Sequence, residues 1–163
     1  MDEQKRALTI MLQELGENYI LDAIFRGYMP PFDAVPATTW TELVDQGQVY
    51  KMPGGGPALY QLTGPGWLAA LEINGGIDDV FRSKLGGLMA ALKERIRGRD
   101  ADGCADVFQV ADTIQCPVGW ICNVIQSRAV QVVLKRKGPR WYSGNPKSHV
   151  IDIPNSLGAA SLL

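Results

Sequence analysis

The order of two hydrophobic periodicities along the chain restricts the fold more than any other feature. Apolar residues spaced three and four apart, as in an amphipathic helix, recur in several segments. Short pieces rich in β-branched or aromatic residues come in pairs, and each pair follows a group of helical segments. This order occurs twice, so the sequence predicts a mainly α-helical α+β fold with small β-hairpins, built from two similar units.

In the first unit, Leu8, Met11 and Leu12 begin a helical face that predicts a helix over residues 5–15. The Pro-Gly-Gly-Gly-Pro run at 53–57 separates two strand-like pieces and predicts the tip of a hairpin. The other elements expected in this unit are short: helices over 19–25 and 38–47, strands over 48–52 and 58–62, and a closing helix over 67–73.

The turn signal Asn74-Gly75-Gly76 predicts a boundary between domains at 1–76 and 77–163. After it, Phe81, Leu85, Leu88 and Leu92 share one face and predict a long helix over 81–96. The remaining elements expected in the second domain are helices over 107–114 and 119–129, strands over 130–134 and 149–153, and a tail from residue 154.

Charge divides the chain near the same boundary. Residues 1–81 hold 4 Lys/Arg and 11 Asp/Glu, a balance of −7, whereas residues 82–163 hold 12 Lys/Arg and 6 Asp/Glu, a balance of +6. A basic surface attracts a phosphate backbone and an acidic one repels it. The second domain is therefore the one expected to bind nucleic acid.

Several motifs resemble the winged-helix branch of the helix-turn-helix proteins. Residues 43–49 resemble a recognition helix entering a wing, and the Tyr-Gln-Leu-Thr-Gly-Pro-Gly run at 60–66 resembles the exit from that wing. Residues 110–117 resemble the second helix and turn, and residues 119–125 resemble the recognition helix of the second domain. The resemblance covers most of the chain and implies two tandem winged helices, without pointing to one named regulator family.

The resemblance implies that the helix over 119–129 reads the major groove of double-stranded DNA. Polar side chains expected on its outer face can pair with base edges; these are Asn123, Gln126, Ser127 and Arg128. The loop after it can rest on phosphates through Lys135, Arg136, Lys137, Arg140 and Lys147. Trp141 and Tyr142 in that loop can stack on bases or pack beneath the wing. The function expected is a transcriptional regulator, with RNA as an open alternative to DNA.

The alternative is a winged-helix adaptor that binds proteins and no nucleic acid. The recognition-helix candidate of the first domain carries Glu42 and Asp45, and its wing has only Lys51. This domain is expected to contact a protein partner, such as a second copy in a homodimer. A solvated outer face and a basic loop that binds nothing are the other interpretation of the second domain.

The sequence offers little for catalysis, and no enzyme activity or cofactor is expected. Neither a phosphate-binding loop with Lys-Ser/Thr nor a Gly-x-Ser-x-Gly elbow occurs. A zinc site would need Cys104, Cys116, Cys122 and His149, which lack the paired spacing of known sites, so no metal is expected. The odd cysteine count and the lack of a signal peptide or apolar span favour a cytoplasmic protein that does not enter a membrane.

Overall fold

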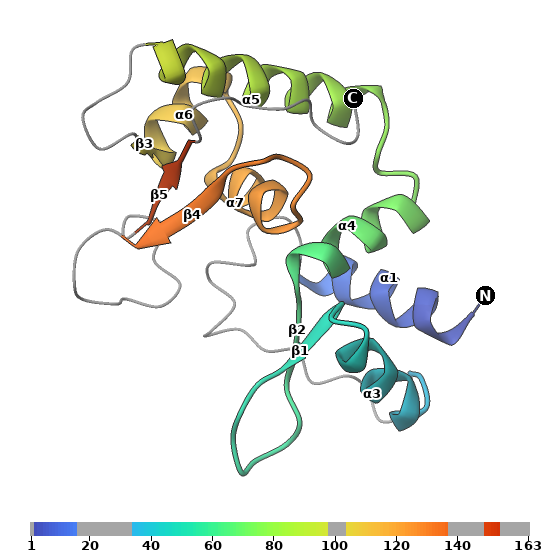
Figure 1. Cartoon of the computed structure of the whole chain (residues 1–163). Helices are drawn as coiled ribbons and strands as arrows, with labels where there is room; N and C mark the ends of the chain where they lie inside the picture. The colour runs from blue at the N-terminus through green and yellow to red at the C-terminus, as the bar shows by residue number, and fades with distance from the viewer. Residues whose placement is uncertain (1, 16–33, 98–103, 137–148, 154–163) are drawn as a thin grey trace.

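The computed structural model describes residues 2–15, 34–97, 104–136 and 149–153, and the fold is mainly α-helical with small antiparallel sheets (Figure 1). The predicted helix over 19–25, the greater part of the basic loop and the tail from residue 154 lie outside these ranges. In the part that is described, no helix is both long enough and apolar enough to cross a membrane.

The first unit contains α1 (Glu3–Leu15), α3 (Ala37–Asp45), the hairpin of β1 (Val49–Lys51) and β2 (Tyr60–Leu62), and α4 (Gly64–Ile73). Gly47 ends α3, because its φ of 72° belongs to the left-handed region that glycine adopts readily. The two strands pair antiparallel, with Val49 opposite Leu62. The predicted elements of this unit are therefore present wherever the chain is described.

Thr63 connects the hairpin to α4. Its Oγ1 accepts a hydrogen bond from the backbone N–H of Gly66 at 3.1 Å and donates one to the carbonyl oxygen of Gly47 at 2.6 Å. The same hydroxyl thus caps the helix and holds it against the end of α3. Pro65 lies in the first turn of α4, where its missing N–H has no intrahelical partner to lose.

The second unit begins with α5 (Asp79–Arg97) and continues with β3 (Cys104–Asp106), α6 (Val107–Ile114), α7 (Val118–Gln126), β4 (Val133–Arg136) and β5 (His149–Asp152). Its sheet has three strands in the order β3-β5-β4, both pairs antiparallel. The sequence predicts only the two strands of the hairpin here, and the structure adds β3, whose three residues are too few to carry a strand pattern.

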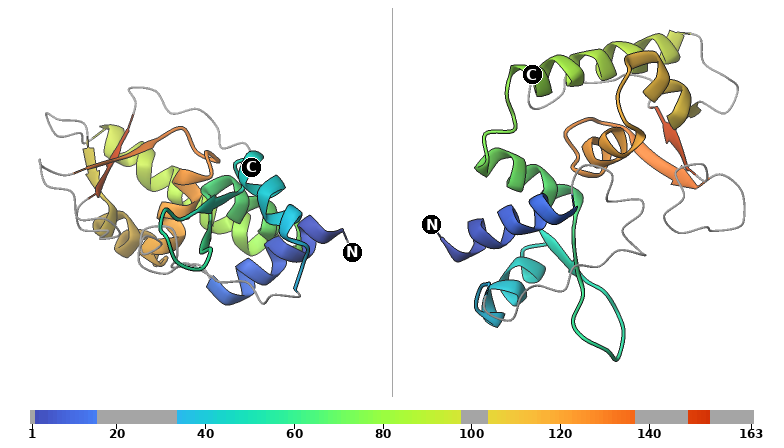
Figure 2. Two further views of the ribbon diagram at one scale, coloured as in Figure 1. Left: turned by 90° about the horizontal axis from the view of Figure 1, so that it is seen from below. Right: turned by 180° about the vertical axis from the view of Figure 1, so that it is seen from behind.

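One hydrophobic core runs through both units. Trp67 of α4 contacts Phe81 of α5, and Phe81 contacts Trp120 of α7, with ring centroids 6.2 and 5.6 Å apart. All three rings are buried. Helices α4 and α7 lie side by side in both Figure 1 and Figure 2, and this contact brings the acidic unit against the basic one.

Candidate nucleic-acid interface

Helices α6 and α7 form the helix pair on which the predicted DNA site depends. Asp106 caps α6 by accepting a hydrogen bond from the N–H of Gln109 at 3.1 Å. Gln115 ends it in the left-handed conformation, with a φ of 54°. The chain then turns through Cys116 and Pro117 into α7, so the predicted helix, turn and helix are present.

The outward face expected for α7 does not exist, because the helix is buried on all sides. The six consecutive residues from Trp120 to Ile125 are all buried, and Asn123 is 0% exposed. Ser127 is 8% exposed, and its hydroxyl donates a hydrogen bond to the carbonyl oxygen of Val124 at 2.6 Å. The prediction that Asn123 and Ser127 face outward towards base edges is therefore wrong.

Helix α4 packs against the C-terminal end of α7, at Gln126 and Ser127. A Cβ built on Gly64, at the start of α4, would overlap the backbone carbonyl of Gln126. Only glycine permits so close an approach between the two helices at this point. The sequence of α7 separates an apolar side from a polar side, but it does not show that a helix of the other unit packs against the end of this helix.

Two of the expected contact residues keep some access to solvent. Gln126 is half-buried, and within the described part of the chain its Oε1 has no hydrogen-bond partner. Arg128 is exposed and follows the end of α7 in the left-handed conformation, with a φ of 64°. It lies beyond the last residue of the helix, Gln126.

Two of the basic residues that follow α7 belong to a strand. Lys135 and Arg136 were expected in a loop, but the structure places them in β4, at one edge of the sheet, with Arg136 opposite His149. The strands β4 and β5 flank the stretch from 137 to 148. Lys137, Arg140 and Lys147, together with Trp141 and Tyr142, lie in that stretch, outside the described residues.

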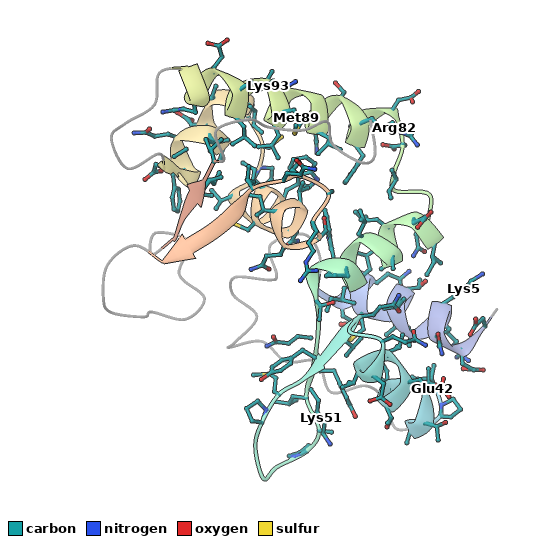
Figure 3. The ribbon with its side chains drawn as sticks, in the orientation of Figure 1. Lys5, Glu42, Lys51, Arg82, Met89 and Lys93 are labelled. Atoms are coloured by element: carbon teal, nitrogen blue, oxygen red, sulfur yellow. The ribbon has the colours of Figure 1, made fainter. Side chains whose placement is uncertain are left out.

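In the first unit, the surface formed by α3 is acidic. Glu42 and Asp45 are exposed on α3, and Glu42 accepts a hydrogen bond from Nε2 of Gln4 at 2.8 Å. Lys51 is exposed at the end of β1. Figure 3 labels Glu42 and Lys51 at the opposite end of the molecule from β4 and β5. This surface would repel a phosphate backbone.

Among the residues that the structure describes, no group of three or more side chains is placed to hold a metal ion. Cys116 and Cys122 are both buried. Burial raises the pKa of the Cys122 thiol to about 12, so it stays protonated and unreactive at neutral pH. In the sheet register, Cys104 lies opposite Asp152, while His149 pairs at the other end of β5.

Comparison of the chain with protein-family models, with curated proteins and with solved structures gave no match.

Proposed function

We propose that this protein binds double-stranded nucleic acid through the β4–β5 hairpin, by contacts to the sugar-phosphate backbone. The observation that carries the proposal is a long acid-free stretch. Residues 113–151 contain six Lys/Arg and no Asp or Glu. A run of positive charges without intervening carboxylates attracts phosphates locally, although the net charge of the whole chain is slightly negative.

The position of the hairpin supports this proposal. Strands β4 and β5 lie at one end of the molecule, and α1 and α3 lie at the other, in each of the three views of Figures 1 and 2. A duplex that met the hairpin would therefore be kept away from the exposed carboxylates of Glu42 and Asp45. Because screened charges interact over about 8–10 Å at physiological salt, such a separation weakens the repulsion.

The element order of the second unit agrees with the winged-helix resemblance. A helix, a strand, a helix pair and a hairpin follow one another, and the last strand of the hairpin pairs with the first strand of the unit. In such an arrangement the hairpin is the wing. We assign binding to this wing and not to α7, because Asn123 and Ser127, two of the four side chains expected to read bases, are buried.

The proposal therefore concerns binding without base recognition. Phosphate contacts fix position and carry no sequence information. Regulation of transcription at a specific site would require base-reading side chains, and of the four expected at α7 only Arg128 is exposed. Architectural or general nucleic-acid binding fits the surface better than operator recognition.

The test compares two double variants that remove the same charge. Lys135→Ala with Arg136→Ala removes two positive charges from β4, and Lys5→Ala with Arg6→Ala removes two from exposed positions on α1. Fluorescence anisotropy with a labelled random-sequence DNA duplex is recorded between 50 and 200 mM salt. The β4 variant is expected to bind on the order of tenfold more weakly, with the slope of log K against log salt reduced by about two.

The α1 variant is expected to bind like the wild type. Equal weakening in both variants would mean that only net charge matters, and the hairpin would lose its special role. No binding at 50 mM salt would reject nucleic-acid binding altogether. Competition with an unlabelled RNA duplex distinguishes DNA from RNA as the preferred ligand.

A protein-binding adaptor is the second candidate function, and the contact between α4 and α7 favours it. The helix that would read DNA is already used to join two units, while α3 presents Glu42 and Asp45 to solvent. Such a protein would show no affinity for the duplex, and light scattering would detect an oligomer that dissociates at high salt.

A further inference from the structure

An open groove runs between α5 and α6. Its volume is about 570 Å³, and Val110 and Ile114 line it from α6. On α5 it is bordered by small residues, of which Gly87 and Ala90 are exposed to solvent. Because the distance between two packed helices depends on the side chains at their contact, a border of this kind gives room for a third helix.

The glycines of α5 are not explained by packing within the described part of the chain. A Cβ built on Gly86 or Gly87 would meet no atom within 4 Å. Glycine inside a helix is destabilising relative to alanine, so two adjacent glycines weaken α5 without giving a visible gain. At Gly87, which lines the groove, the missing side chain allows another backbone to lie close to the helix.

Charge differs between the two ends of the groove. Ser83 and Lys84 line one end, and no acidic residue is among the described ones that line it there. The Nζ of Lys84 lies 5.8 Å from the centre of the Trp120 ring and forms no ion pair with any described residue. Glu94 and Arg95 line the other end. The Lys84 end is therefore suited to a carboxylate.

We propose that the groove receives α3 of a second copy of this chain. The outer face of α3 has small side chains and then acidic ones: Ala37, Thr38 and Thr41 are exposed, and so are Glu42 and Asp45. These positions are three or four residues apart and thus share one side of the helix. The small residues can lie against those of α5, and the carboxylates can lie beside the lysine.

One orientation matches both the small residues and the charges. When α3 runs antiparallel to α5, Glu42 and Asp45 reach Lys84, and the N-terminal end of α3 lies towards Glu94. A carboxylate is favourable beside a helix N-terminus, which carries a partial positive charge. The first turn of α3 has no acidic residue of its own. The single carboxylate that lines the groove therefore does not oppose this arrangement.

The dimensions and positions of the two surfaces allow the contact. The groove follows α5 from Ser83 to Arg95, about 18 Å at 1.5 Å per residue, and α3, with 9 residues, is about 14 Å long. Helices α3 and α5 lie at opposite ends of the molecule in Figure 1 and in the right-hand view of Figure 2. Figure 3 likewise labels Glu42 far from Arg82 and Lys93 of α5. A chain therefore cannot fill its own groove with α3, and copies would associate head to tail.

The inference does not rest on nucleic-acid binding, because it uses no residue of the hairpin, and it gives the adaptor alternative a specific partner. The test is sedimentation velocity of the full-length protein, free of nucleic acid, at about 50 and about 500 mM salt. The wild type is expected to associate as its concentration rises at the lower salt. At the higher salt the association should be at least about tenfold weaker, because ions screen the paired charges.

Two charge-reversed variants test which surfaces meet. Glu42→Lys with Asp45→Lys makes the end of α3 basic, and Ser83→Glu with Lys84→Glu makes the end of the groove acidic. Each variant alone should associate at least about tenfold more weakly than the wild type, because like charges then face each other. Mixed in equal amounts, the two variants should associate again, because the basic α3 of one meets the acidic groove of the other.

Two glycine variants give a matched comparison without a change of charge. Gly87→Gln fills the groove, whereas Gly86→Gln places the same side chain on the neighbouring position, which does not line it. Both positions are open in space, so both variants are expected to fold. The Gly87 variant should associate at least about tenfold more weakly than the wild type, and the Gly86 variant should associate like it.

Three results would overturn the proposal. The first is a wild type that stays monomeric at every concentration at the lower salt. The second is a pair of charge-reversed variants that each associate like the wild type, or that fail to associate when mixed. The third is equal association of the two glycine variants. None of these results bears on duplex binding, which depends on the hairpin.

Discussion

At the scale of single residues, burial decides which side chains of α7 can take part in chemistry or binding. Cys122 is 0% exposed, and burial raises the pKa of its thiol from 9.0 to about 12. Asn123, its neighbour, is equally buried. Both belong to the packing of the helix, and neither can serve as a nucleophile or a contact to a base.

The raised pKa of Cys122 predicts a loss of stability in alkali. Between pH 9 and 12 the native thiol keeps the proton that the unfolded thiol loses, so the free energy of unfolding falls as the pH rises through this window. Urea denaturation at pH 8 and pH 10 should show a loss about 1 kcal/mol larger in the wild type than in Cys122→Ala. Identical losses in the two proteins would show that the thiol ionises freely in the native state.

The residue scale is also where prediction from sequence succeeded least. Asn123 and Ser127 occupy polar positions of an amphipathic pattern, and such positions usually face solvent. The pattern records polarity and not the neighbours of a side chain. The sequence feature that could have indicated close packing is the pair Gly64 and Gly66 at the start of α4, because two such small residues allow close contact with other backbones.

At the scale of elements, the sequence predicted much more. The helices that the structure describes lie close to their predicted positions, because their apolar spacing or their capping residues mark them in the sequence. The hairpin of β1 and β2 follows from its Gly- and Pro-rich tip. Strand β3 was missed, since three residues are too few for a period, and its pairing with β5 depends on contacts distant in sequence.

The contact between α4 and α7 gives a prediction about two glycines. Gly64→Ala places a methyl group against the backbone of Gln126 and should lower the free energy of unfolding by about 1–3 kcal/mol, because the helices must move apart. Gly86→Ala meets open space in α5 and should raise it by up to about 1 kcal/mol. Thermal or urea denaturation measures both. An unchanged stability in the Gly64 variant would contradict the close packing.

At the scale of the whole molecule, the described core is continuous across the two units. Phe81 lies between Trp67 and Trp120, so one aromatic cluster joins α4, α5 and α7. The Nζ of Lys84 lies 5.8 Å from the centre of the Trp120 ring, within the range of a cation–π interaction. Units that share such a core are expected to lose their structure together.

Phe81→Ala tests this cooperativity. Removing the ring leaves a cavity between two tryptophans and should cost about 3–5 kcal/mol. In urea, tryptophan fluorescence and far-UV circular dichroism should give the same midpoint in the wild type, and the same lower midpoint in the variant. Separate midpoints for the two probes would show that the units unfold independently.

The close contact of Gly64 with α7 also has a consequence for dissecting the protein into fragments. The turn at Asn74-Gly75-Gly76 invites a cut there, yet α4 and α7 would then fall on different pieces. A fragment beginning at residue 77 would expose the side of α7 that α4 covers, and nucleic acid or other proteins could adhere to it for that reason alone. A protein divided at this turn is therefore better studied by co-expressing the two fragments, so that they can reassemble, than by studying either fragment alone.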